Sequence, residues 1–149
     1  MVPLSKPLEG FMGSLLSHDE ELNLQKKSYH AMSVWHRISS GIMEAFYLVH
    51  PADNGNSMLP YFHEISGRLL CIYSRLSEID MHLWNREHEK AVVNLESCET
   101  SVLVLISILE ASPVKSEVID GCIESVYGFL YLMREYIEEF KPLLFVCSE

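Results

Sequence analysis

The segment from Ser101 to Leu109, SVLVLISIL, is apolar or small on every side of a helix and on both faces of a strand. A water-soluble domain buries such a segment, so the fold must wrap around it. Val and Ile favour strands, but the chain has only one such segment, and a lone strand would have no partner. We therefore predict the second half of a buried helix. Val102, Leu105 and Leu109 are expected to face the main core. Four further residues need cover from elsewhere: Leu103, Val104, Ile106 and Ile108.

Apolar residues recur at steps of three and four along four stretches, which predicts four helices at about 18–50, 58–84, 88–111 and 113–140. Ser17 and Glu20 have the spacing of a capping box at the first start. Pro51 and the loop-forming segment after it end that helix. Ser57 is the expected cap of the second helix, and within that helix Gly67 is expected to permit a close helix approach.

The most regular seam lies in the second helix, at Phe62, Ile65, Leu69, Ile72, Leu76, Ile79 and Leu83. The seam of the third helix is one residue out of register with it, at Ala91, Leu95, Cys98, Val102, Leu105 and Leu109. The polar segment WNREHEK between them therefore predicts a turn near 85–89 rather than one continuous helix. Ser112 and Pro113 predict the cap and first residue of the last helix, and Pro142 predicts its end.

These helices have similar lengths and short connections, which favours an all-α, antiparallel four-helix bundle. Residues 1–16 contain two prolines and two glycines and are expected to form an irregular N-terminal arm. Residues 17–149 are expected to form a single helical domain that ends in a short apolar tail, LLFVC.

The formal net charge of −10 disfavours nucleic-acid binding, because the basic residues do not cluster. The longest apolar run is interrupted by Glu99 and Glu110 and is shorter than the ~20 residues of a membrane span, so we expect no membrane insertion. Four scattered cysteines, without a C-x-x-C pair, predict reduced thiols in a cytoplasmic or nuclear protein, three of them in the core. Those expected in apolar helical stretches are Cys71, Cys98 and Cys122.

Motifs for catalysis, nucleotide binding or metal binding do not emerge from the sequence, and we expect no cofactor. Glu78 and His82 share one helix face, with His88 nearby. These three residues support an alternative hypothesis, a small helical enzyme or a ligand- or metal-binding bundle with a polar site. Di-iron bundles use Glu-x-x-His motifs, which this chain lacks.

The last helix carries a second apolar stripe beside its core seam, although a four-helix core needs only one face from each helix. We therefore predict a non-catalytic protein–protein interaction or oligomerisation module, an acidic adaptor or scaffold that forms a homodimer along this helix. A viral bundle that holds a helical peptide of the host in a groove is a variant of this hypothesis. The expected interface residues are Trp84, Ile119, Ile123, Tyr127, Leu130, Tyr131, Ile137, Leu143, Leu144 and Phe145.

Overall fold

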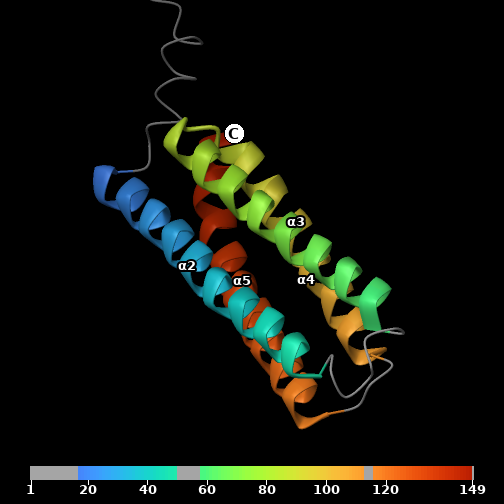
Figure 1. The fold of residues 1–149 in the computed structure, drawn as a ribbon. Coiled ribbons are helices and arrows are strands. Elements are labelled where there is room, and N and C mark those ends of the chain that lie inside the picture. The colour runs from blue at the N-terminus through green and yellow to red at the C-terminus, as the bar shows by residue number, and fades with distance from the viewer. Residues whose placement is uncertain (1–16, 50–57, 113–115, 149) are drawn as a thin grey trace, which may run out of the picture.

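The computed structural model contains four long helices joined by short connections (Figure 1). It describes residues 17–49, 58–112 and 116–148; the side chains of residues 47–49, 58, 59 and 143–148 are excluded from that description. The helices are α2 (His18–Val49), α3 (Met58–Trp84), α4 (His88–Glu110) and α5 (Glu117–Ser148). The described residues include no strand.

Each helix runs antiparallel to the next, and α5 returns to pack against α2, which closes a ring of four helices (Figure 1). The predicted antiparallel four-helix bundle is therefore confirmed. The predicted turn between the second and third helices is also confirmed, at residues 85–87. Because the ring is closed, every helix contacts a neighbour on both sides of its core face.

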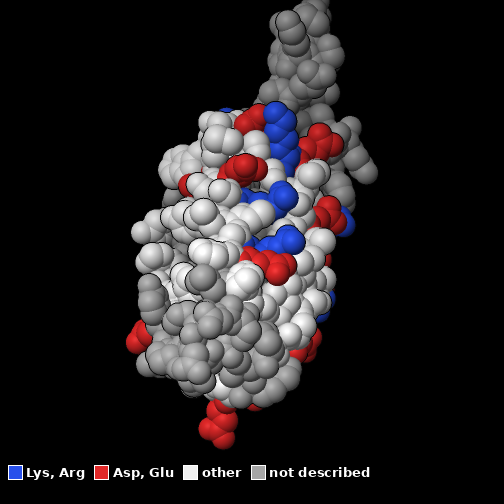
Figure 2. Space-filling view, turned by 45° about the vertical axis from the view of Figure 1, so that its right-hand side comes forward, with Lys and Arg blue, Asp and Glu red and all other residues white. Residues whose placement is uncertain are grey.

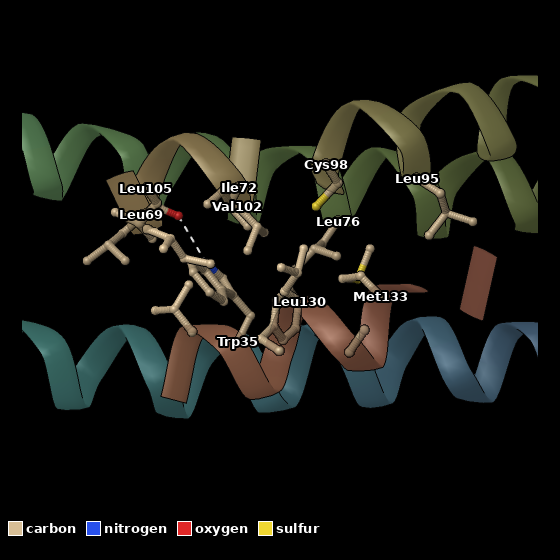
Figure 3. Packing of buried hydrophobic residues seen from close by; sticks show 14 of the residues in the cluster. Trp35, Leu69, Ile72, Leu76, Leu95, Cys98, Val102, Leu105, Leu130 and Met133 are labelled. Carbon is tan, nitrogen blue, oxygen red and sulfur yellow. Dashed lines mark hydrogen bonds between the residues drawn. The ribbon is translucent and has the colours of Figure 1, made fainter. Parts of the chain in front are cut away.

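The core lies on the bundle axis, where side chains from all four helices point toward one another (Figure 3). Trp35 of α2 is fully buried, and its indole Nε1–H donates a hydrogen bond to the Leu69 carbonyl of α3 at 3.1 Å. The Trp35 ring also lies 4.7 Å from the ring of Phe129 in α5, measured between centroids. Trp35 therefore joins three helices and leaves no polar atom of its own unpaired.

The predicted core seams of α3 and α4 are confirmed almost residue by residue. From Ile65 to Leu83, every predicted seam position of α3 is buried, and Phe62 is half-buried. The six predicted seam residues of α4 are buried as well, and all but Leu95 are completely inaccessible. The segment Ser101–Leu109 is thus the second half of a core helix, as its composition requires.

The cover that this segment needs is incomplete. Ile106 is buried and Ile108 is half-buried within the chain, whereas Leu103 and Val104 remain exposed. The Ile108 carbonyl, in the last turn of α4, accepts a hydrogen bond of 2.6 Å from the Tyr61 hydroxyl of α3. This bond satisfies one of the carbonyls that a helix end leaves without a partner.

Two helix starts show how side chains decide where a helix begins. At α2, the capping box is confirmed: Glu20 N–H donates to Ser17 Oγ, and Ser17 N–H donates to the Glu20 carboxylate, each at 3.0 Å. The predicted start of the last helix at 113 is wrong. Ser116, whose Oγ accepts the Val118 N–H at 3.0 Å, caps α5, whereas Ser112 is buried behind the end of α4. The Ser57 cap of α3 lies outside the described residues.

The predicted end of the last helix at Pro142 is also wrong, because α5 continues to Ser148 and includes the predicted tail. A proline removes one N–H and displaces the carbonyl four residues earlier, here that of Glu138. Both Pro142 and Glu138 are exposed, so the lost hydrogen bond lies on the solvent side of the helix. Phe140, buried beside the proline, anchors the preceding turn to the core.

Three smaller expectations are corrected. The sequence pattern of the last helix places Val118 at the start of its core seam, but Val118 is on the surface and the neighbouring Ile119 is buried. Cys71 is exposed, since it lies one residue outside the buried seam of α3. A Cβ atom added at Gly67 would meet no atom within 4 Å, so this glycine does not mark a close helix approach.

Candidate interaction surface

The predicted interface residues divide into four groups in the structure. Trp84 and Tyr131 are exposed, while Ile119 and Leu130 are buried by the same chain. Ile123, Tyr127 and Ile137 are half-buried against the core. The side chains of Leu143, Leu144 and Phe145 lie outside the described residues.

The second apolar stripe of α5 is therefore mostly covered within the chain. The expectation that each helix buries only one face is wrong for α5, because α2 and α4 pack against both of its flanks. Ile119 and Leu130 have 2% and 1% of their surface exposed and cannot contact another molecule in this fold. Of the predicted interface residues on α5 whose side chains are described, Tyr131 is the exposed one.

Charged pairs line the outer seam between α4 and α5. Arg134 Nε lies 2.8 Å from Glu99 Oε2, and Lys141 Nζ lies 3.0 Å from Glu96 Oε2. Arg134 and Lys141 are the two basic residues of α5. The positive charge of this helix is thus paired inside the chain, in contacts that each contribute at most about 1 kcal/mol at a surface.

The residues of the alternative polar site do not form one site. His82 Nδ1 lies 3.1 Å from Glu87 Oε1 in the turn that follows α3, not against Glu78, which is exposed. His88 is buried at the first turn of α4, and burial lowers its pKa below the usual value; Glu21 opposes this shift and Arg86 adds to it. Across the described part of the chain, no group of three or more His, Cys, Asp or Glu side chains is arranged to hold a metal ion.

His82 and Glu87 serve the turn instead. Glu87 N–H donates to the His82 carbonyl at 2.7 Å, and Arg86 N–H donates to the Leu83 carbonyl at 3.2 Å. These are the two bonds of a Schellman motif, in which the residue after the C-cap adopts a left-handed conformation. That residue is Arg86, with φ of 58°. The polar residues near 82–88 therefore have a structural role in closing the α3–α4 hairpin.

The two thiols of the core are unsuited to nucleophilic chemistry. Burial raises the pKa of Cys98 to about 12 and also raises that of Cys122. At neutral pH both are protonated, and the thiol is a far weaker nucleophile than the thiolate.

Charge is distributed unevenly between the two halves of the bundle. Helices α4 and α5 together contain ten acidic and three basic residues, whereas α2 and α3 together contain seven acidic and five basic residues. The net charges are thus −7 and −2, counting histidine as neutral. On the face shown in Figure 2, basic side chains lie directly beside acidic ones and do not form a separate patch.

An apolar stripe lies exposed on α3, on the less charged half of the molecule. Its members are Leu70, Tyr73, Met81 and Trp84, whose side chains are 69%, 40%, 48% and 64% exposed. At 3.6 residues per turn these positions fall within an arc of about 80°. Single exposed apolar residues are ordinary, but an aligned set of four large ones is typical of a contact surface.

The stripe adjoins a hollow of about 430 Å³ between α2 and α3. Leu70 and Tyr73 form its α3 wall, with the buried Leu69 and Ser66, and the α2 wall consists of His36, Ser39 and Met43. Tyr29, two turns before His36 on the same face of α2, is 72% exposed. None of the hollow's lining residues carries a formal charge at neutral pH, counting His36 as neutral.

A second hollow lies between α2 and α5, and glycines form part of its floor. Gly41 and Gly121 line it together with small or short side chains such as Ala45 and Ser125. A Cβ atom at either glycine would meet no atom within 4 Å. Arg37 also lines this hollow, which makes it more polar than the one beside α3.

By length and composition alone, α4 could also cross a membrane. Core helices of water-soluble proteins have the same properties, and nine residues of α4 are buried in the bundle. The predicted absence of membrane insertion therefore stays a prediction. Comparisons with protein-family models, with curated proteins and with solved structures found no match to this chain.

Proposed function

We propose that this chain is a non-catalytic protein–protein interaction module whose contact surface lies on α2 and α3. The observation that carries this proposal is the exposed stripe of Leu70, Tyr73, Met81 and Trp84. Tyr and Trp are enriched among residues that dominate binding energy, because they bury a large area with few rotatable bonds. The sequence predicted contacts through α5, but most of the stripe behind that prediction is buried by α2 and α4.

The acidic composition supports the same placement. For a partner that is itself acidic, a contact through α4 and α5 would have to overcome a net charge of −7, whereas the α2–α3 half carries −2. Like charges brought together at an interface cost free energy and slow association. We also propose that the protein acts in the cytoplasm or nucleus, because its buried thiols belong to different helices and form no disulfide among the described residues.

Site-specific photo-crosslinking tests whether the stripe contacts another protein. A photoreactive phenylalanine analogue replaces Leu70 on α3 in one variant and Val93 on α4 in the matched control; these side chains are 69% and 63% exposed. After irradiation in the native cells, we expect a protein adduct from position 70 and none from position 93. The absence of an adduct at position 70, or an equal yield at both positions, contradicts the proposal.

A further inference from the structure

The stripe on α3 has a spacing that is symmetric about one residue. From Leu70 the steps to Tyr73, Ser77, Met81 and Trp84 are three, four, four and three residues. Ser77, the central position, is small and exposed. Reversing the direction of the helix therefore gives the same pattern, with large apolar residues at both ends and a small residue in the middle.

We propose that the occupant of this surface is a second copy of the chain, with the two α3 helices packed antiparallel about a two-fold axis at Ser77. This inference rests on the proposed function and names its partner. In a two-fold interface, if residue i contacts residue j, then j also contacts i. Leu70 of each copy then faces Trp84 of the other, Tyr73 faces Met81, and the two Ser77 residues meet at the axis, where their small size lets the helices approach.

The charge distribution favours a second copy over a basic partner. The stripe contains no charged residue, and four of the five charged residues of α3 lie on other faces of the helix, with Asp80 at the edge of the stripe. Two copies that meet here place their α4–α5 halves, each with a net charge of −7, on opposite outer sides of the dimer. A basic partner would instead be attracted to those outer helices.

The overlap of the two copies is short, so we expect a weak dimer. Because α3 ends at Trp84, the pairing about Ser77 brings residues 70–84 of the two helices together, about 22 Å of helix, and two adjacent helices are about 20 Å wide, which gives a face of about 440 Å². Standard interfaces bury about 800 Å² on each partner, so the dissociation constant should lie at the weak end of the range for specific dimers. The hollow of about 430 Å³ beside Leu70 is in place to receive Trp84 of the second copy, because these two positions face each other across the axis.

Sedimentation equilibrium with matched charge variants tests the arrangement. We expect the wild type to dimerise and Leu70→Glu to raise the dissociation constant at least about 30-fold, as for a residue that dominates binding. Val93→Glu and Tyr131→Glu, at similarly exposed positions on α4 and α5, should leave the constant unchanged. All three positions are on the surface, and circular dichroism confirms that each variant retains its helices.

The antiparallel pairing makes a more specific prediction, which a charge swap tests. Leu70→Lys alone should weaken the dimer, and adding Trp84→Glu should restore part of the affinity, because the two new charges face each other across the axis. In a Cys71→Ser and Cys147→Ser background, Ser77→Cys should form a disulfide between copies on mild oxidation. Ser107→Cys, also exposed but on α4, should not.

Tryptophan emission reports the contact directly. Trp35 is fully buried, so a change of the signal with protein concentration must come from the exposed Trp84. We expect emission to shift to shorter wavelength as concentration rises through the dissociation constant, and no shift in Trp84→Phe.

The proposal is overturned by a monomeric wild type, by a dimer that Tyr131→Glu but not Leu70→Glu dissociates, or by the lack of a Ser77→Cys crosslink. Crosslinks from position 70 to a different protein would contradict the claim that a second copy occupies this surface, but they would agree with the proposed function.

Discussion

Replacing the two glycines of the α2–α5 hollow with alanine should stabilise the bundle. Gly41 and Gly121 lie inside helices, and a Cβ atom at either position meets no atom within 4 Å. Alanine is about 0.8–1.0 kcal/mol more favourable than glycine in a helix interior, because an unfolded chain with alanine at that position has less backbone entropy to lose on folding than one with glycine. The double variant Gly41→Ala/Gly121→Ala should therefore gain about 1.6–2 kcal/mol in the free energy of unfolding.

Urea unfolding followed by circular dichroism measures this gain. With a slope of about 2 kcal/mol per M, the midpoint should rise by about 0.8–1 M while the slope stays constant. Gly128→Ala, on α5 but not lining the hollow, is the matched control and should gain as much as either single variant. An unchanged or lower midpoint at position 41 or 121, together with a gain at 128, would refute the reasoning, because the two glycines would then be needed for close contact between α2 and α5.

Three further perturbations follow from individual contacts. Tyr61→Phe removes the hydroxyl that caps the Ile108 carbonyl and should lower the free energy of unfolding by about 1–2 kcal/mol in urea titrations. His88 has a folded pKa below that of the unfolded chain, so the unfolded state binds the proton first and stability should fall as pH drops below about 6.5. His88→Gln should flatten this dependence in thermal scans at several pH values. Pro142→Ala restores one helical N–H and should raise the melting temperature, with a gain of at most about 3 kcal/mol.

The fold was predictable because its signals are local and redundant. The seam from Ile65 to Leu83 repeats without interruption, and reciprocal hydrogen bonds between Ser17 and Glu20 fix the start of α2. The errors occurred where two local signals compete. Ser112 and Ser116 are both reasonable caps, and the sequence does not show that the first would be buried behind α4.

Pro142 illustrates a different limit of sequence reasoning. A proline ends a helix only if the lost hydrogen bond costs more than the packing that the following turn gains. Here the proline and Glu138, whose carbonyl loses its donor, are both exposed, and Phe140 between them is buried. The orientation of residue 142 depends on how α5 packs in the bundle, which the rule for proline does not include.

The contact surface was harder to locate than the fold. The double apolar stripe of α5 suggested an open face, but in a closed ring each helix has two neighbours and buries a wide arc. Ile119 and Leu130 belong to that arc. The symmetric spacing about Ser77 was visible in the sequence, yet its meaning depends on which flank of α3 remains uncovered. Exposure is a property of the assembled ring, so composition and periodicity alone could not assign it.

The salt dependence of association distinguishes the proposed contact between two α3 helices from a contact between this chain and a basic partner. Each copy has a net charge of −10, held mainly on helices that would lie far from the two-fold axis. The screening length falls from about 30 Å at 0.01 M salt to about 8 Å at 0.15 M, so repulsion between the outer helices is felt only at low salt. We expect the dimer dissociation constant to decrease several-fold between these concentrations and then level off, because the interface itself contains no ion pair to weaken. A contact that held the acidic helices against basic groups would weaken as salt rises, and such a result would contradict the uncharged two-fold arrangement.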